Sequence, residues 1–352
     1  MNGKNICILT EGGGDRGFGH ITRCLSLYQA CKRKSVRAEL IVNGDDSVLD
    51  LLKGAQYVML DWLSETKKLK GMISSANIVI VDSYLAGKGL YDSLSEATRG
   101  QLVMMDDYRR VNYPEGIIVN PSICGEKFDY GKRRSLLGEE YIVLREEFCE
   151  VPEKKINEKV GHILITCGGS NYSDFIQQVQ QNLEEKFGVD CNVISPVTGG
   201  VHASEMIDLM LKADICVSGG GQTLYELARV GVPTVAICLA DNQKGNIEGL
   251  RDEGVIEYAG SIDDEDLMRG IECAIERLLP QKEREKRSRA GRSHVDGWGA
   301  ERIIENILSL GERTINIRCA DSNDCHDLWE WRNHPGTREW CFDRQEIKYE
   351  DH

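Results

Sequence analysis

The sequence lacks a long apolar segment, a C-x-x-C pair and an excess of positive charge. Because the N-terminal residues carry no long apolar run, we expect neither a signal peptide nor a membrane span. Thirteen cysteines are present, but several lie inside apolar strands, where a thiol acts as a small hydrophobe. The formal net charge of −14 argues against nucleic acid or an anionic membrane as the main partner. Together these features favour a location in a reducing cytoplasm.

Metal-ligand spacing is also missing from the sequence. No cluster of His, Cys, Asp or Glu has the spacing of a metal site, so we expect no metal and no other cofactor. The length of 352 residues predicts two domains of ordinary size. Hydrophobic residues make up 41% and charged residues 28%, which is typical of a globular protein.

A glycine-rich turn at residues 11–23 (EGGGDRGFGHITR) follows an apolar strand at residues 6–10. Apolar residues then recur every three or four positions from Ile21, which predicts a helix that begins near His20. The positive end of the helix dipole disfavours imidazolium, so we expect His20 to be neutral and able to accept a proton. The glycines would let a substrate approach the backbone closely. The alternative is a turn whose histidine merely caps the helix.

The same turn contains the dinucleotide-binding pattern G-x-G-x-x-G at residues 12–17. That pattern also needs an acidic residue at the end of the second strand, where it holds the ribose hydroxyls. Here the second strand ends in Asn43 and Gly44, and acids follow only at Asp45 and Asp46. A nicotinamide cofactor is therefore not expected.

Strands and helices alternate through the first half of the chain. Continuous apolar strands such as residues 78–81 predict a parallel sheet that is buried on both faces. Several strands end in polar residues, and ligands of open α/β sheets bind outside such carboxyl ends. Each polar residue could cap a helix or form a turn, but one shared cleft explains all of them. The polar strand ends are Thr10, Asp82, Asp106 with Asp107, and Asn120; the expected strands are 4–10, 38–43, 56–60, 77–82, 102–106 and 117–120, and the expected helices 20–34, 46–53 and 64–75.

A charged, proline-containing stretch at residues 146–159 indicates a linker, and the alternation then starts again. A second glycine-rich turn, residues 218–223, begins a helix, so its backbone N–H groups form an expected anion site. Glu226 on that helix is either a surface acid or a carboxylate that binds ribose hydroxyls. The basic segment 282–292 is typical of a solvated helix face. The expected strands are 162–167, 190–194, 214–218 and 233–238, and the expected helices begin near 173 or span 203–212, 222–231, 243–253, 263–279 and 298–310.

Residues 218–243 (SGGGQTLYELARVGVPTVAICLADNQ) resemble the donor-nucleotide segment of nucleotide-sugar enzymes that have the glycosyltransferase-B (GT-B) fold. In that family the glycine turn faces the diphosphate and the helix glutamate holds the ribose. The resemblance implies an α/β fold of two Rossmann-like domains that face each other across a cleft. The expected boundaries are residues 1–150 for the domain with the catalytic histidine and 151–310 for the nucleotide-binding domain.

A closer resemblance, over about residues 4–310, is to the UDP-2,4-diacetamido-2,4,6-trideoxy-β-L-altropyranose hydrolase family of pseudaminic acid biosynthesis. Spore-coat polysaccharide proteins share the pattern. One departure is Asp-Ser-Tyr at residues 82–84, where the hydrolase family has Asp-His-Tyr, and it bears on which sugar is bound. The motifs that carry the resemblance are GFGHITR at 17–23, VDSY at 81–84, MDD at 105–107, REEF at 145–148 and CGGSN at 167–171.

The resemblance implies His20 as the catalytic residue and Glu226 as the ribose ligand. The implied reaction is a metal-independent, inverting hydrolysis of a UDP-diacetamido sugar, in which His20 deprotonates water and helix N-termini stabilise the departing UDP. A glycosyltransferase, a UDP-sugar 2-epimerase and a non-catalytic nucleotide-sugar-binding protein are the alternatives. The other implied substrate-binding residues are Gly17, Gly19, Arg23, Asp82, Tyr84, Asn171, Gly220, Gly221, Gln222, Thr223, Asn242 and Gln243.

The last segment differs from the rest of the chain. Residues 315–352 resemble the opening of a GNAT-type N-acetyltransferase, and the part that would bind acetyl-CoA does not follow. Three tryptophans, Trp329, Trp331 and Trp340, make a disordered tail the weaker interpretation. We therefore expect residues 311–352 to form an incomplete acetyltransferase-like segment.

Overall fold

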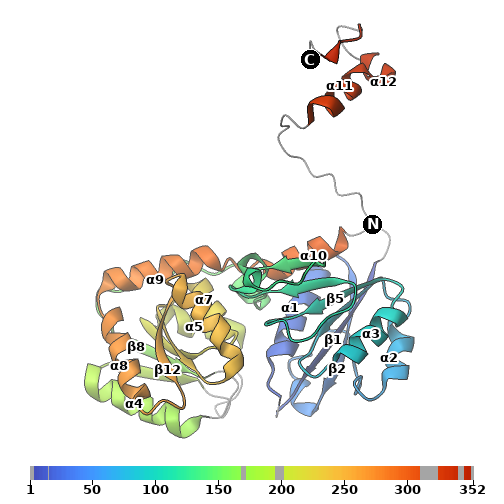
Figure 1. Cartoon of the computed structure of the whole chain (residues 1–352). Coiled ribbons are helices and arrows are strands. Elements are labelled where there is room, and N and C mark those ends of the chain that lie inside the picture. Colours follow the sequence, from blue (N-terminus) through green and yellow to red (C-terminus); the bar gives the residue numbers. More distant parts are fainter. Residues whose placement is uncertain are drawn as a thin grey trace. The chain divides into compact units, whose positions relative to one another are not determined.

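The computed structural model describes residues 4–14, 16–167, 172–194, 202–309, 324–339 and 345–349. The chain divides into a compact body, Met1–Leu308, and a separate C-terminal unit, Ser309–His352. The body contains two parallel β-sheets, each covered by helices, as Figure 1 shows. The expected pair of parallel-sheet α/β domains is therefore confirmed.

The first sheet has seven parallel strands in the order β3-β2-β1-β4-β5-β6-β7. Its central strands are continuously apolar and buried, which is what the uninterrupted apolar runs predict. Thr10 of β1 lies opposite Asp82 of β4, so the carboxyl ends of these neighbouring strands meet at one edge. The strands are β1 (Asn5–Gly12), β2 (Arg37–Gly44), β3 (Tyr57–Met59), β4 (Ile78–Asp82), β5 (Gln101–Met105), β6 (Ile117–Asn120) and β7 (Arg134–Leu137); the helices are α1 (Gly19–Arg33), α2 (Thr66–Ile73) and α3 (Lys88–Ala97).

Three features of this domain differ from the prediction. The helix expected over residues 46–53 is only a 3₁₀ turn, Asp46–Val48, because the Asp45 carboxylate accepts the Ser47 N–H and begins a tight turn. The helix α3 and the edge strand β7 were not predicted. The strand β7 is short and mixed in polarity, so its sequence gives a weak signal, whereas α3 has an apolar face with Tyr91 and Leu94 buried that the prediction overlooked.

The second sheet has five parallel strands in the order β12-β11-β10-β8-β9. The strand β12 was not predicted, whereas the other four were. The basic segment 282–292 does form a helix, but Arg284 in it is completely buried. The strands are β8 (His162–Thr166), β9 (Asp190–Ile194), β10 (Ile215–Gly219), β11 (Thr234–Cys238) and β12 (Ile256–Ser261); the helices are α4 (Ser173–Phe187), α5 (Ala203–Lys212), α6 (Thr223–Val230), α7 (Lys244–Asp252), α8 (Leu267–Leu278), α9 (Gln281–His294) and α10 (Gly299–Leu308).

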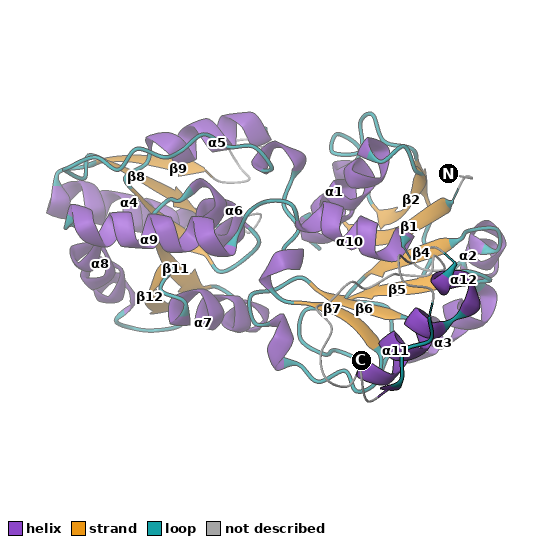
Figure 2. Cartoon of the chain, turned by 90° about the horizontal axis from the view of Figure 1, so that it is seen from above, coloured by secondary structure: helices purple, strands orange, loops and turns teal. Residues whose placement is uncertain are grey.

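The last helix of the body, α10, packs against α1 of the first domain, and the two lie side by side in both views (Figures 1 and 2). The segment 146–159 between the sheets has no regular element except a 3₁₀ turn, Glu146–Phe148. That segment is held in place: the Arg284 guanidinium donates to the carbonyls of Asn157 and Glu158 at 2.9 and 3.0 Å. The boundaries expected at 150 and 310 stay predictions.

The described part of the C-terminal unit has two short helices, α11 (Cys325–Asn333) and α12 (Pro335–Arg338). The Trp329 indole N–H donates to the Ile347 carbonyl at 2.6 Å, and its ring meets Tyr349 edge-on with the ring centroids 5.6 Å apart. Trp340 lies outside the described residues. Trp329 and Trp331 therefore lie on a helix, and the acetyltransferase likeness of this unit stays a prediction.

Candidate active site

His20 is the second residue of α1, close to where the sequence predicts the helix to begin. Its Nδ1 lies 2.8 Å from Oδ1 of Asp82, the last residue of β4. The other ring nitrogen, Nε2, has no hydrogen-bond partner among the described residues, and the side chain is 15% exposed. The ring therefore has one nitrogen fixed by a carboxylate and the other available to a ligand.

Arg23, one turn further along α1, connects two carboxylates. Its Nε and Nη2 donate to Asp82 at 2.8 and 2.6 Å, and its Nη1 donates to Asp107 at 2.7 Å. The Tyr84 hydroxyl donates to Asp107 at 2.6 Å, and the Tyr84 ring meets the His20 ring edge-on at 4.3 Å between centroids. We call these five residues, His20, Arg23, Asp82, Tyr84 and Asp107, the His20 cluster.

The pKa shift of His20 has the opposite direction to the one expected at a helix N-terminus. Burial lowers the pKa of His20, but the charge and hydrogen bond of Asp82 outweigh burial, and the net pKa is above 6.5. Burial raises the pKa of Asp82, but Arg23 and His20 hold it well below its usual range. The helix N-terminus alone suggested the opposite direction for His20. An ionised Asp82 that accepts the Nδ1–H also fixes the tautomer in which Nε2 is the proton acceptor.

The neighbouring acids Asp106 and Asp107 have different roles. Asp106 is buried and accepts hydrogen bonds from the backbone N–H groups of Arg109 and Arg110 and from the hydroxyls of Tyr113 and Tyr130. Its side chain therefore fixes the loop after β5. Only Asp107 joins the His20 cluster.

Glu11 is a site residue that the sequence analysis missed. Its carboxylate is buried and accepts from the Ser83 hydroxyl at 2.5 Å and from the Tyr84 and Leu85 N–H groups at 2.8 and 3.0 Å. It therefore fixes the turn that carries Tyr84. An acidic residue that extends an otherwise apolar strand was the available signal.

The first glycine-rich turn is closed by hydrogen bonds between Gly13 and Gly17 in both directions, at 3.1 and 2.8 Å. Gly17 has a φ of 77°, a conformation that L side chains rarely adopt. At Gly19 the position of a Cβ would have no heavy atom within 4 Å. The turn thus requires glycine at position 17 for its backbone, while Gly19 leaves open space beside His20.

The second glycine-rich turn is braced by two glutamines that the sequence analysis expected to bind substrate. The Gln243 Oε1 accepts the N–H groups of Gly220 and Leu239, both at 3.0 Å, and the Gln222 amide donates to the Val143 carbonyl. The Gly220 N–H is therefore already bonded. No Cβ contact would arise within 4 Å at Gly221, where the turn is open.

The remaining expected residues lie around this turn. Thr223 is the half-buried first residue of α6, and Asn242 is exposed in the 3₁₀ turn Asp241–Gln243. Asn171 lies outside the described residues. Glu226 is buried, and Arg145 binds its carboxylate with two hydrogen bonds of 2.7 and 2.9 Å.

Tyr225, the neighbour of Glu226, contacts the first domain. Its hydroxyl donates to the Asn246 side chain at 2.7 Å and accepts the Ile123 N–H of the first domain at 3.2 Å. Burial is the main cause that raises the pKa of Tyr225, and the charges of Asp107 and Arg23 also act on it. The residue beside Glu226 is therefore within electrostatic reach of the His20 cluster.

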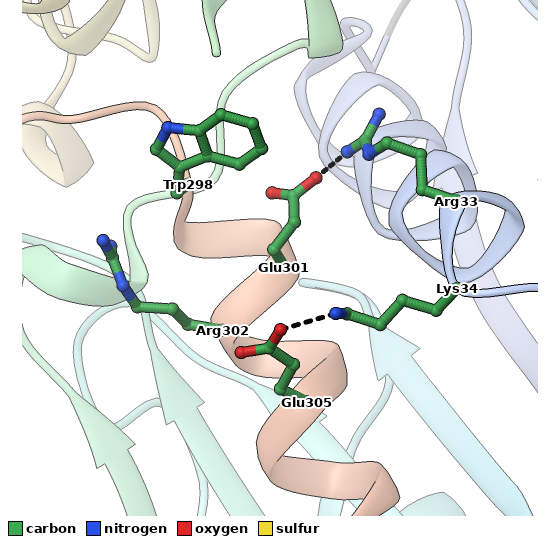
Figure 3. Close-up of a pocket in the computed structure, with 6 residues that line it drawn as sticks. All are labelled: Arg33, Lys34, Trp298, Glu301, Arg302 and Glu305. Carbon is green, nitrogen blue, oxygen red and sulfur yellow. Dashed lines mark hydrogen bonds and ion pairs between the residues drawn. The ribbon is translucent and has the colours of Figure 1, made fainter.

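A surface pocket of about 390 Å³ lies elsewhere, between α1 and α10. Figure 3 shows that four of its charged side chains form two pairs: Arg33 with Glu301, and Lys34 with Glu305. It is at the opposite end of α1 from His20, about 20 Å away at 1.5 Å per helical residue. The pocket marks where α10 is attached to α1, not the expected substrate site.

Two searches of the described residues gave no candidates. Within the described ranges, no group of three or more His, Cys, Asp or Glu side chains could hold a metal ion. No helix in the described part of the chain is both long and apolar enough to cross a membrane.

This chain is similar to proteins whose names refer to glycosyl transfer or to sugar and polysaccharide biosynthesis. Residues 147–302 match the model of the glycosyltransferase family 28 C-terminal domain. A Helicobacter pylori protein named pseudaminic acid cytidylyltransferase and UDP-2,4-diacetamido-2,4,6-trideoxy-β-L-altropyranose hydrolase is 24% identical over 67% of this chain and 44% of its own length. The Bacillus subtilis spore coat polysaccharide biosynthesis protein SpsG is 22% identical over 88% of this chain and its whole length.

Solved structures agree on the fold. The crystal structure of Acinetobacter baumannii MurG superposes with a TM-score of 0.60 over 87% of this chain and all of that protein, at 12% sequence identity. The calicheamicin glycosyltransferase CalG4 gives a TM-score of 0.57 over 89% of this chain and all of that chain, at 14% identity. The predicted GT-B fold is confirmed.

Proposed function

We propose that this protein hydrolyses a UDP-linked 2,4-diacetamido-2,4,6-trideoxy sugar to UDP and the free sugar, with inversion at the anomeric carbon. The observation that carries the proposal is the hydrogen-bonded His20–Asp82 pair, with Nε2 of His20 unbonded, at the carboxyl edge of a parallel sheet. The broader assignment, a GT-B enzyme of sugar or polysaccharide biosynthesis that acts on a nucleotide sugar, is supported by the family match, the two relatives and the fold.

His20 is the general base of the proposed reaction. Asp82 holds the Nδ1–H and so presents the Nε2 lone pair to a water molecule, which attacks the anomeric carbon on the face opposite the diphosphate. Since the pKa of His20 is raised by Asp82, its basic form becomes dominant at a higher pH than that of an ordinary histidine. We therefore expect kcat/KM to rise with pH through that raised pKa.

The nucleotide binds the second domain in this proposal. The N-terminus of α6 follows the glycine turn, and the positive end of its dipole stabilises the negative charge that develops on the diphosphate. Glu226 binds the ribose hydroxyls. Gln243 and Gln222 hold the glycine turn in place through hydrogen bonds to backbone groups. UDP is a good leaving group once its charge is stabilised, so little general-acid assistance is required.

Incubation with a panel of UDP-diacetamido sugars tests the proposal, with UDP release and the sugar product followed together. We expect UDP release without an added acceptor, and loss of turnover in His20→Ala. The matched control is His162→Ala, because His162 is half exposed at the start of β8 and should leave turnover unchanged. UDP release only in the presence of an acceptor would indicate a transferase. A product that is a stereoisomer of the substrate and still carries UDP would indicate a 2-epimerase, and binding without turnover would indicate a nucleotide-sugar sensor. Each of these results would contradict hydrolysis.

We further propose the domain limits 1–150 and 151–310, with residues 311–352 as an incomplete GNAT-like segment. The separation of a C-terminal unit from residue 309 onward supports the last limit. Hydrolysis would then belong to the body alone.

A further inference from the structure

Arg145 begins the REEF segment, residues 145–148, which the sequence analysis singled out but to which the proposed reaction gives no role. Its Nε and Nη2 donate to the two different oxygens of the Glu226 carboxylate at 2.7 and 2.9 Å. The Glu226 side chain is 6% exposed and that of Arg145 is 23% exposed. No other described residue hydrogen-bonds this carboxylate.

The paired contact with Arg145 fixes the orientation of the Glu226 carboxylate and also neutralises its charge. Two parallel N–H···O bonds set the plane of the carboxylate as well as its position, which a lysine ammonium cannot do. Each carboxylate oxygen accepts one bond from Arg145 and keeps a second acceptor position. Each oxygen can therefore accept one further hydrogen bond, and the orientation that Arg145 sets decides from which direction a ribose hydroxyl can donate it.

Arg145 is itself held in place by the rest of the segment. Glu146 forms an ion pair with Arg33 of α1, and the fully buried Phe148 ring lies 5.1 Å from the Arg145 guanidinium. Arg229 of α6 donates to the carbonyls of Phe148 and Cys149 at 2.8 and 2.6 Å. The segment is thus attached to both domains, and it sets where Arg145 can reach.

We propose that Arg145 is a positioning residue: it orients the Glu226 carboxylate so that the enzyme distinguishes ribose from 2′-deoxyribose in its nucleotide. This inference rests on the proposed function, in which Glu226 binds the ribose. Arg145 acts through Glu226 and requires no contact of its own with the nucleotide.

Calorimetric titration with UDP and 2′-deoxy-UDP measures this discrimination. The wild-type protein should bind UDP about tenfold to a hundredfold more tightly, as expected for one hydrogen bond to a charged group. Arg145→Gln should reduce the ratio to about threefold or less, and so should Glu226→Gln. The double variant should add little to either change, because both remove one interaction. Arg251→Gln is the matched control, since Arg251 is an exposed arginine of α7 that pairs only locally, and it should keep the wild-type ratio.

The outcomes separate this inference from the proposed function. If Arg145→Gln is folded and keeps the wild-type ratio, or weakens both nucleotides equally, the positioning role is wrong while UDP binding stands. If the wild-type protein binds neither nucleotide, the proposed function is wrong first. If Arg145→Gln does not fold, Arg145→Lys replaces it in the test. Arg145→Lys should still bind UDP, with a UDP to 2′-deoxy-UDP affinity ratio between those of the wild-type protein and Glu226→Gln, and an unchanged ratio would overturn the inference.

Discussion

Replacement of Asp82 by asparagine changes the protonation of His20 in a direction that the structure determines. The variant removes the charge that raises the pKa of His20, while burial and the nearby Arg23 guanidinium, which both lower that pKa, remain. The pKa of His20 should therefore fall, even though Asp107, a smaller cause that raises it, remains. Because a general base works in its deprotonated form, the acid limb of the kcat/KM profile should move to lower pH.

This shift comes from the difference between the Asp82 contacts of the two protonation states of His20. Both states can donate the Nδ1–H to Asp82, but only imidazolium also gains from the Asp82 charge, so the limb should move measurably to lower pH. The rate on the plateau should fall as well. Without Asp82 the Nδ1–H tautomer is no longer enforced, and loss of a positioned base costs about 10²–10⁴-fold.

The assay combines the pH dependence of kcat/KM with direct NMR titration of His20, whose signal is assigned with His20→Gln. Asp107→Asn is the matched control, because Asp107 also pairs with Arg23 but does not bond His20, and it is a smaller cause of the raised pKa. The control should move the limb much less. Thermal unfolding must show that each variant is folded, since breaking a buried ion pair costs about 3–5 kcal/mol. An unchanged His20 titration in a folded Asp82→Asn protein would refute this reasoning.

Three further predictions concern the rest of the chain. Arg284→Met removes the donor to the carbonyls of Asn157, Glu158 and Leu278, so it should lower the free energy of unfolding in urea by about 3 kcal/mol or more. The control Arg289→Met, at an exposed position of the same helix, should change that free energy by less than about 0.5 kcal/mol, and equal effects of the two variants would contradict the structural role of Arg284. Glu301→Ala, which leaves Arg33 only its exposed partner Glu146, should lower that free energy by about 1–3 kcal/mol, and the exposed Glu305→Ala by about 0.5 or less; the reverse order would place the α1–α10 attachment elsewhere. Deletion of residues 313–352 should leave UDP-sugar hydrolysis within about twofold, and the full chain should not acetylate an amino-sugar nucleotide with acetyl-CoA; loss of hydrolysis in a folded protein, or any such acetylation, would show that the C-terminal unit has been misjudged.

Local sequence patterns were sufficient for most of the fold. Apolar runs such as residues 78–81 predicted buried parallel strands, and the period after Ile21 predicted α1 within one residue of its start. Short elements with mixed polarity, β7 and β12, escaped because a strand of four to six residues at a sheet edge needs little apolar character.

The site could be predicted only in part, because its contacts join residues far apart in the sequence. His20 was found from its place at a helix start, but its protonation depends on Asp82, 62 positions later. Likewise Glu226 was found on its helix, whereas its partner Arg145 lies 81 positions earlier. Asp106 and Asp107 looked equivalent in sequence, but Asp106 is hydrogen-bonded within its own loop, whereas Asp107 bonds Arg23 and Tyr84.

Hydrolysis in oxygen-18 water tests the central claim, attack of a His20-activated water on the anomeric carbon, most directly. We predict that the wild-type protein places the label on the anomeric oxygen of the released sugar, with none in UDP. His20→Ala should abolish labelling while UDP affinity, measured by calorimetry, barely changes, because the nucleotide binds the other domain. Label in UDP would mean attack at phosphorus and would contradict both the inverting mechanism and the role of His20.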